Sequence, residues 1–392
     1  MKATSHGGLL IAILALLSIF PPLATDMYLA ALGHLARDLN TSASAAEMSL
    51  SIFFLGLGVG QLIMGPLIDG YGRKIPLLFG TLLFIFSSIA LIFVQDIVLF
   101  NGLRFLQAIG ACAGMVISRA IVADLYEGQE AAKKMTVLVM LMTVGPIISP
   151  TIGSLLYEGF GWRSIFVVMV IVGLTALILS KLYISETLAR EKRTKSPFKV
   201  VIENAKILLF QNNYIVPVIV GAFVQSAMFA FITGSSGVFQ GIFKLDALHY
   251  GFAFAAIAVA LFVFGSINKK LLDHYKPVQI LTAALPIYVC VAIVLNLVAG
   301  TENLWIYCIP LWFNIGFVSL VSASAIALAM GAARERAGAG SALLGVLQFS
   351  IAFLVSTAVA IGGTDTTLPM SLGILIPAIL ACGLWFWKKP QD

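Results

Sequence analysis

Two charged groups, the carboxyl group of Asp26 and the guanidinium group of Arg104, lie well inside long apolar stretches of this sequence. A charge inside a stretch that crosses a membrane is costly and by default marks a functional site. Asp26 lies about seven residues before the end of its stretch and Arg104 about seven residues after the start of its own, so at ~1.5 Å per residue both lie ~10 Å below the same membrane surface. We therefore expect the two charges to share a level.

Proton binding is the chemistry that such a pair can perform. A buried carboxyl group can alternate between its protonated and ionised forms as its access to water and its distance from a cation change. A guanidinium group keeps its proton throughout. We expect Asp26 to be a proton site and Arg104 to be the fixed charge coupled to it. The same residues leave open a permanent salt bridge that only locks the first and fourth helices together.

The elements that hold these charges follow from composition. The chain has 392 residues, of which 60% are hydrophobic and 11% charged, whereas soluble domains are roughly 25% charged. Its apolar stretches are long enough to cross a bilayer as helices. We predict an all-α integral membrane protein whose twelve transmembrane helices span 7–33, 45–66, 75–94, 97–121, 134–157, 162–183, 214–239, 247–268, 277–299, 303–330, 337–361 and 367–387.

A charged segment divides these helices into two sets of six. We predict an N-terminal six-helix bundle at 1–183, a cytoplasmic linker at 184–213 and a C-terminal six-helix bundle at 214–392. The stretch 265–270 occupies the place in the second bundle that 65–74 has in the first, which indicates two pseudo-symmetric bundles. In transporters built from repeats, the substrate site lies between them near the middle of the membrane.

Lysine and arginine residues set the expected orientation. Of the 24 such residues, only Arg37, Arg163 and Lys244 fall in loops on the side opposite to the N-terminus. Positive residues gather on the cytoplasmic side of membrane proteins. We therefore expect a multi-pass protein of the bacterial inner (cytoplasmic) membrane with both termini in the cytoplasm. Its basic loops would meet the lipid bilayer, and no nucleic-acid partner is expected.

We expect no cofactor, no metal ion and no catalytic residue. The four cysteines lie in apolar stretches without a Cys-x-x-Cys pair, which argues against a metal site or a disulfide framework. The sequence has no P-loop pattern for ATP. A membrane enzyme would need several converging nucleophiles, acids or metal ligands, and Asp26 stands nearly alone inside the predicted helices.

The loop between the second and third predicted helices has the spacing Gly-x3-Asp-x2-Gly-Arg-Lys, formed by Gly65, Asp69, Gly72, Arg73 and Lys74. This spacing resembles the signature loop of the major facilitator superfamily of transporters. The residues alone leave open a solvated turn that anchors two helix ends.

The resemblance implies that this loop is a conformational latch. Asp69 is expected near the start of the eleventh helix, at about 338–341, because a helix N-terminus favours a carboxylate. Arg73 is expected to pair with Asp124 at the cytoplasmic end of the fourth helix. Together these contacts would hold the two halves in the outward-open state.

The fourth predicted helix also resembles this family. Its pattern Arg104-x2-Gln107-Ala108-x-Gly110 resembles the family pattern Arg-x2-Gln-Gly-x-Gly, with Ala108 in place of a glycine. In the family this arginine is implicated in proton coupling, which the resemblance implies for Arg104. Small residues here also permit close helix packing.

In the fifth predicted helix, Gly145-Pro146 and Pro150-x2-Gly153 resemble the antiporter signature of exporters in this superfamily. Proline kinks a helix because it removes a hydrogen bond, and glycine permits close packing. The motif favours export over import, although a kinked helix by itself is compatible with many functions.

Further segments resemble the Bcr/CflA-type multidrug-resistance branch, whose members are twelve-span drug:proton antiporters. They are 25–29, Asp124 and 185–188, whereas the stretch 30–33 departs from the prolines that are usual in that branch. The resemblance implies proton-coupled efflux of small amphiphilic compounds or drugs by alternating access between the two sides. We expect the protein to be a monomer. The alternative on the same fold is a dedicated exporter of an endogenous metabolite such as a siderophore.

Polar and aromatic side chains inside the predicted helices are the candidates for a substrate cavity. They are Tyr28, Gln61, Gln107, Gln225, Phe229, Phe231, Asn314 and Gln348. Each residue has the alternative role of packing or hydrogen bonding between helices.

Overall fold

The computed structural model describes residues 7–388, except for the side-chain surroundings of residues 7, 128, 132, 136, 139, 141, 143, 192 and 335. Every regular element in this part of the chain is helical. Eleven of its helical segments are long and apolar enough to cross a membrane. The long helix α7 (Gly128–Phe160) lies between the fourth and fifth of them, so the order of long helices is that of the twelve predicted ones.

The helices before the linker are α1 (Gly7–Ser18), α2 (Phe20–Asp26), η1 (Leu29–Ala31), α3 (Leu32–Asp38), α4 (Ala43–Tyr71), α5 (Lys74–Phe93), α6 (Ile97–Leu125), α7 and α8 (Arg163–Tyr183). The linker contains η2 (Arg190–Lys192) and α9 (Pro197–Leu209). The second half consists of α10 (Asn212–Ser236), η3 (Gly237–Ile242), α11 (Ala247–Leu272), α12 (Pro277–Leu297), α13 (Leu304–Ala332), η4 (Arg334–Arg336), α14 (Ala337–Gly362) and α15 (Leu368–Lys388).

The first predicted helix, 7–33, is broken, and in this respect the prediction of one continuous helix is wrong. Helix α1 ends at Ser18, and α2 begins with prolines at its first positions, which have no N–H to donate to the preceding turn. The chain leaves the α-helix again directly after Asp26 and continues in the short 3-10 helix η1. The break places Asp26 at the last residue of α2.

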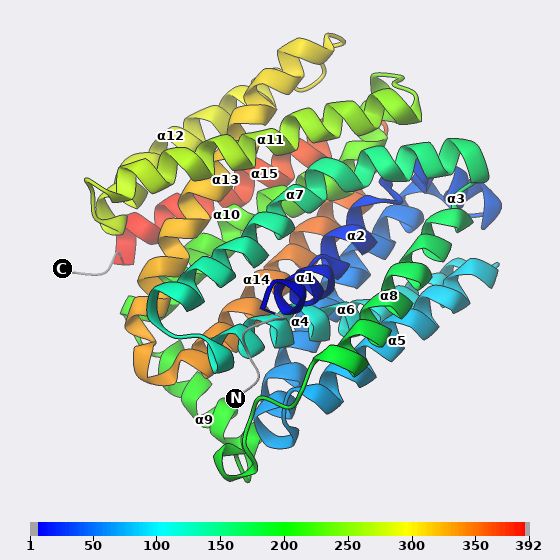
Figure 1. Cartoon of the computed structure of the whole chain (residues 1–392). Helices are drawn as coiled ribbons and strands as arrows, with labels where there is room; N and C mark the ends of the chain where they lie inside the picture. The colour runs from blue at the N-terminus through cyan, green and yellow to red at the C-terminus, as the bar shows by residue number, and fades with distance from the viewer. Residues whose placement is uncertain (1–6, 389–392) are drawn as a thin grey trace.

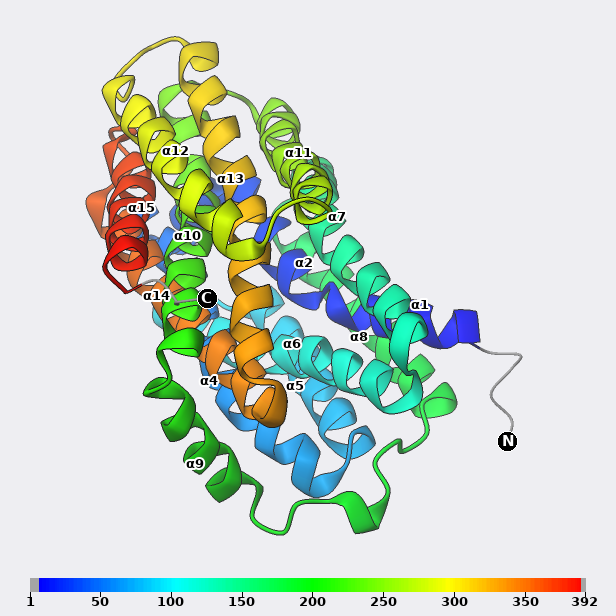
Figure 2. The ribbon, with the colours of Figure 1, turned by 90° about the vertical axis from the view of Figure 1, so that its left-hand side faces the viewer.

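The two halves meet along two pairs of helices. Helix α4 packs against α14, and α7 packs against α11, as Figures 1 and 2 show from two sides. Near the α3 end of the molecule, a Cβ atom added at Gly251 of α11 would lie 2.9 Å from the Ser154 Oγ of α7. The hydroxyl groups of Ser51 and Ser356 lie 2.7 Å apart between α4 and α14. The halves are therefore in close contact at the α3 end.

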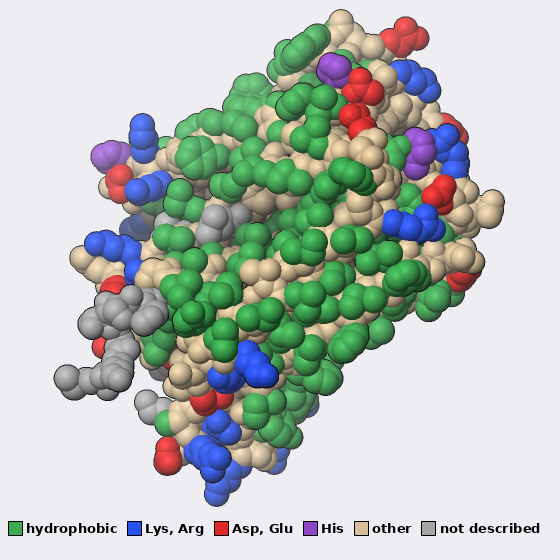
Figure 3. Space-filling model, turned by 45° about the vertical axis from the view of Figure 1, so that its right-hand side comes forward, with side chains coloured by type: hydrophobic (Ala, Val, Ile, Leu, Met, Phe, Trp, Pro, Cys, Tyr) green, Lys and Arg blue, Asp and Glu red, His purple; other side chains and the backbone are tan. Residues whose placement is uncertain are grey.

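The surface has the pattern of a membrane protein. In Figure 3, hydrophobic side chains cover the middle of the visible face, and charged side chains gather toward its ends. The exposed apolar side chains of the described residues include Phe79, Phe86 and Ile171. A surface of this kind is stable in contact with lipid tails rather than with water.

Candidate functional site

The break after α2 presents the carboxyl group of Asp26 to a cavity between the two halves. Asp26 is only 1% exposed. Its Oδ1 accepts a hydrogen bond of 2.7 Å from the Thr25 hydroxyl, and its Oδ2 has no hydrogen-bond partner among the described residues. The carboxyl group therefore keeps one oxygen free for a proton or a ligand.

Arg104 does not pair with Asp26: no ion pair joins these two described residues. Its Nη2 donates to the Ala24 carbonyl of α2 at 2.8 Å, and its Nη1 donates to Gln107. The guanidinium lies between two rings, 4.5 Å from the centroid of Tyr28 and 4.3 Å from that of Phe53. The alternative of a permanent salt bridge is therefore wrong, because Arg104 is bound to the backbone of α2 rather than to its acid.

The central cavity, which contains Asp26, has a volume of about 360 Å³ and lies between the two halves. Its walls come from α2, α4, α6 and α7 of the first half and from α10, α11, α13 and α14 of the second. Apart from Asp26 and Arg119, the described residues around it are uncharged and mostly apolar. The cavity suits a ligand with a large apolar body and a charged or polar group.

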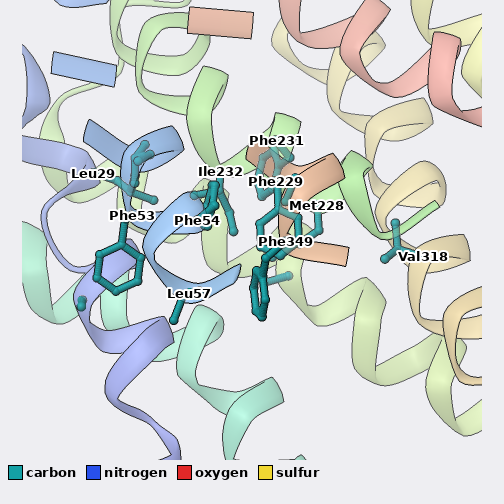
Figure 4. Close-up of a cluster of buried hydrophobic side chains, with 14 of the residues drawn as sticks. Leu29, Phe53, Phe54, Leu57, Met228, Phe229, Phe231, Ile232, Val318 and Phe349 are labelled. Atoms are coloured by element: carbon teal, nitrogen blue, oxygen red, sulfur yellow. The ribbon is translucent and has the colours of Figure 1, made fainter. Parts of the chain in front are cut away.

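Aromatic rings form part of the wall between the halves. The ring centroids of Phe54 and Phe229 lie 4.5 Å apart, and those of Phe229 and Phe349 lie 5.9 Å apart. Figure 4 shows this cluster, with Phe54 to the left of Phe229 and Phe349 below it. Phe229 therefore lies where side chains from both halves meet.

The structure brings only part of the predicted cavity set to the cavity. Gln225, Phe229 and Gln348 line it, as predicted. The other members of the set lie elsewhere, and for them the prediction of a cavity position is wrong: Tyr28, Gln61, Gln107, Phe231 and Asn314.

Each of these five side chains is occupied within the packing of the helices. The Tyr28 hydroxyl lies 2.8 Å from the Ser49 hydroxyl, and Gln107 Nε2 donates to Ser88. Gln61 fills the space beside Gly345, where an added Cβ would lie 2.7 Å from the Gln61 Cδ. The remaining two lie in the second half: Phe231 stacks on Phe254, and Asn314 Nδ2 donates to the Pro310 carbonyl.

The motif of α7 holds the turn that carries Asp26. A Cβ atom added at Gly153 would lie 1.8 Å from the Met27 carbonyl oxygen, so only glycine fits at this position. A Cβ atom added at Gly145 would lie 3.0 Å from the ring of Pro22. Pro146 lines the central cavity, and the Pro150 carbonyl accepts a hydrogen bond from Ser154. Helix α7 therefore supports both ends of α2.

The charged loop between α4 and α5 forms a compact network. Arg73 Nε and Nη2 donate to the two carboxylate oxygens of Asp124, at 2.9 and 3.2 Å, which is the predicted pairing. Arg73 Nη1 also donates to Asp69 at 2.9 Å. Gly72 has a positive φ of 91°, a conformation that glycine adopts without strain. The network holds the loop against the end of α6.

The linker joins this network through Glu186 and Thr187. The Thr187 hydroxyl donates to Asp124 Oδ2 at 2.6 Å, and the Glu186 carboxylate accepts from the backbone N–H of Arg73 and that of Lys74, at 2.8 and 3.2 Å. Burial alone would raise the pKa of Glu186, but these backbone hydrogen bonds lower it to a net value below the usual 4.5. A carboxylate is favoured here because it caps the N-terminus of α5.

Asp69 does not make the predicted contact with the eleventh helix. Its carboxylate binds Arg73 in the same loop, and the hydrogen bonds and ion pairs of the described residues do not connect it to residues 338–341. The latch is expected for an outward-open protein, whereas the halves of this structure are in contact at the α3 end.

Sequence reasoning missed two charged residues. Arg119 lines the same central cavity as Asp26, and its Nη2 donates to Met142 Sδ at 3.4 Å. Glu47 is 3% exposed although it lies in the first turns of α4. Both lie within two residues of the ends of predicted helices. Charged residues are common at such ends, so the sequence does not show that these two face the interior. The expectation that Asp26 stands nearly alone is therefore wrong.

The geometry described so far, two sets of long helices with a cavity between them, also matches a known family. Residues 14–357 match the Major Facilitator Superfamily. The chain belongs to the major facilitator superfamily. This membership confirms the predicted family, the all-helical membrane fold and a transporter rather than an enzyme.

Relatives within the superfamily cover nearly the whole chain. The chain is 32% identical to the "Uncharacterized MFS-type transporter YdgK" of Bacillus subtilis, over 95% of this chain and 94% of the relative. It is 28% identical to the "Bicyclomycin resistance protein homolog" of Haemophilus influenzae, over 91% and 90%. It is 27% identical to the "Multidrug resistance protein MdtL" of Citrobacter koseri, over 95% and 93%.

Solved structures of the superfamily have the same fold. A crystal structure of a D-xylose-proton symporter has a TM-score of 0.76 at 15% identity and covers 99% of both chains. A bacterial homologue of the human lysosomal transporter Spinster, in an inward-facing conformation, has a TM-score of 0.72 at 12% identity and covers 99% of this chain and 98% of that one.

Proposed function

We propose that this protein is a proton-coupled efflux transporter of small amphiphilic compounds. It exchanges external protons for a drug-like substrate across the bacterial inner membrane and keeps both termini in the cytoplasm. The observation that carries this proposal is the unpaired carboxyl oxygen of Asp26, which faces a largely apolar cavity between the two halves in the part of the chain that the structure describes.

The cavity favours competition between a proton and a substrate. A buried carboxylate without a cation partner is costly, so Asp26 is best accommodated when it carries a proton or faces a cationic group. A lipophilic substrate that enters the cavity contacts the aromatic wall around Phe229 and displaces water. The proton and the substrate then occupy the cavity in alternate steps of the cycle.

Arg104 supports this site by holding the backbone next to Asp26 in place. Its hydrogen bond to the Ala24 carbonyl fixes the end of α2 two residues before Asp26. Its charge stays constant, since a guanidinium group does not lose its proton. Arg104 is therefore a positioning residue for the proton site.

The two bundles, 1–183 and 214–392, alternate access by rocking about this cavity as a monomer, with 184–213 as the cytoplasmic linker. The loop formed by Gly65, Asp69, Gly72, Arg73 and Lys74 acts with Asp124 as a latch of the linker side. The resistance proteins among the relatives support export of drug-like compounds.

The experiment is a measurement of proton flux in proteoliposomes with an imposed pH gradient. Lipophilic cations, phenicol-like drugs and iron chelators are added in turn to the natural protein and to Asp26→Asn. We expect at least one amphiphilic compound to trigger proton movement in the natural protein and none to do so in the variant. Glu302→Gln, a change of an exposed acid in the loop before α13, is the control and should couple normally.

Two results would contradict the proposal. Normal proton coupling in Asp26→Asn would exclude Asp26 as the proton site. A substrate that moves through the natural protein at the same rate with and without a pH gradient would exclude antiport. Binding of the same compound to Asp26→Asn, measured by quenching of tryptophan fluorescence, shows that the variant is folded.

A further inference from the structure

A second cavity lies at the α3 end of the molecule, apart from the one that holds Asp26. It has a volume of about 330 Å³, opens to the surface, and is lined by η1, α3 and α4 of the first half, by α10, η3 and Leu245 of the second half, and by the loop after α14. Its polar lining includes His34, Arg37, Glu47, Gln240 and Thr364. This cavity, which we name the α3-end cavity, lies where the two halves are in contact.

Glu47 is the buried acid of this cavity. It is 3% exposed, and no hydrogen bond or ion pair of its carboxyl group occurs among the described residues. The carboxyl group reaches across to the second half, where a Cβ atom added at Gly237 would lie 3.1 Å from Glu47 Oε1. The absence of a side chain at Gly237 therefore makes room for this acid at the contact between the halves.

Tyr250, in the first turn of α11, lies within electrostatic range of both Asp26 and Glu47, the two buried acids of the described residues. Its hydroxyl lies 2.8 Å from the Ser235 hydroxyl of α10. Tyr250 is completely buried, so the charge on either acid is felt at the same hydroxyl group.

We propose that Glu47 is a second proton-binding carboxyl group, which exchanges protons with the medium through the α3-end cavity and allows the halves to close at that end only when it is protonated. This inference rests on the proposed proton coupling and adds a second site to it. Ionised Glu47 is costly when it is buried without a partner. Its ionised form therefore favours the open arrangement, in which water reaches it, and its protonated form favours the closed one.

The other groups around Glu47 do not neutralise it. From α3, the Arg37 Nη2 is hydrogen-bonded to His34 Nε2 at 2.8 Å, and His34 also contacts Tyr157. From α11, the facing titratable group is Tyr250. The lining residues of α10, η3 and the loop after α14 are uncharged. His34 is therefore the group that must be separated from Glu47 in a test of pH dependence.

The experiment measures access to the α3-end cavity as a function of pH. A cysteine is introduced as Gln240→Cys, and its reaction with a membrane-impermeant thiol reagent is followed in proteoliposomes while the pH on the reagent side is varied and the inner pH is held constant. The rate is divided by that of Thr366→Cys, an exposed position in the loop after α14. This ratio removes the effect of pH on the thiol itself, and the parent protein gives the background of the native cysteines.

We expect the ratio to rise with pH in the Gln240→Cys protein, because ionisation of Glu47 opens the cavity. Addition of Glu47→Gln should abolish this pH dependence and hold the ratio at its low-pH value. Glu47→Asp, which keeps a titratable group, and His34→Gln should both retain the dependence. If Glu47→Gln does not fold, Glu47→Asp still tests the role of Glu47, because it keeps a carboxyl group at the site.

The outcomes separate this inference from the proposed function. A pH dependence that persists in Glu47→Gln, or that is lost in His34→Gln instead, overturns the role of Glu47 even if drug-triggered proton flux is normal. A ratio that does not change with pH in the Gln240→Cys protein overturns it as well. Absence of drug-triggered proton flux in the natural protein overturns the proposed antiport, whatever the labelling shows.

Discussion

The two halves of the molecule bury different kinds of polar group. Among the described residues, the buried charged side chains are Asp26, Glu47, Arg73 and Arg104, and all four belong to the first half. The buried polar side chains of the second half are serine, threonine and asparagine residues, which are neutral. The halves share a helical plan, but they divide the chemistry unequally.

The same difference appears at corresponding loops. In the first half, Arg73 binds the carboxylates of Asp69 and Asp124. At the corresponding place in the second half, Asn268 Oδ1 accepts a hydrogen bond of 3.0 Å from the Ser324 hydroxyl. Among the described residues, the first half therefore buries the charged side chains, and the buried polar side chains of the second half are neutral.

The largest loss of stability is expected at Arg104, the buried guanidinium group of the first half that binds two partners at once. Arg104→Lys keeps the charge but cannot bind the Ala24 carbonyl and Gln107 together from one planar group. We expect a loss of ~3 kcal/mol in stability, since a hydrogen bond to a charged group contributes about 1.5–3 kcal/mol. This loss is measured by comparing the unfolding free energies of the purified variant and the natural protein in mixed micelles. Unchanged stability and transport would show that the charge alone suffices.

A second prediction concerns the close contact that supports Asp26. Gly153→Ala places a methyl group against the Met27 carbonyl, and overpacking of this kind costs about 1–3 kcal/mol. We expect weaker folding and reduced proton coupling. Gly159→Ala in the same helix meets no atom within 4 Å and is the matched control. If the two variants changed stability and coupling equally, the effect would come from the helix propensity of alanine and not from the contact with Met27.

A third change makes the second half resemble the first. Asn268→Asp introduces a carboxylate at a position that is 3% exposed, where Ser324 is the hydrogen-bond partner. We expect a destabilisation of about 1–2 kcal/mol, because no buried arginine of the described second half neutralises it as Arg73 does in the first. Thermal unfolding at neutral pH checks this value. A variant as stable as the natural protein would show that the second half tolerates charge equally well.

The smallest effect is expected at the linker. The pKa of Glu186 is below its usual value of 4.5, so its hydrogen bonds stabilise the fold above that pH and are lost as the pH falls through the lowered value. Glu186→Gln should cost less than about 1 kcal/mol near neutral pH, since the group is partly exposed. The difference from the natural protein should shrink in unfolding experiments below pH 4.5. A constant difference at all pH values would exclude the charge as its cause.

Much of the fold could be predicted because the membrane imposes one period and one length on every helix. The order of the long helices follows from the apolar stretches, and the pairing of Arg73 with Asp124 follows from the resemblance of the loop. The break between α1 and α2 has a visible cause in the sequence, the pair Pro21-Pro22, whereas no proline marks the second break, directly after Asp26. Apolar content alone does not distinguish a straight helix from an interrupted one.

The sequence by itself determined that this chain crosses a membrane many times, that Asp26 and Arg104 lie within it, and that the chain resembles a family of transporters. Only the tertiary structure decided which of these charges face a cavity. It directed Arg104 to a backbone carbonyl, placed Arg119 in the same cavity as Asp26 and buried Glu47 at the contact between the halves. The physical reason is that burial depends on which helices pack together, and residues far apart in the chain make those contacts.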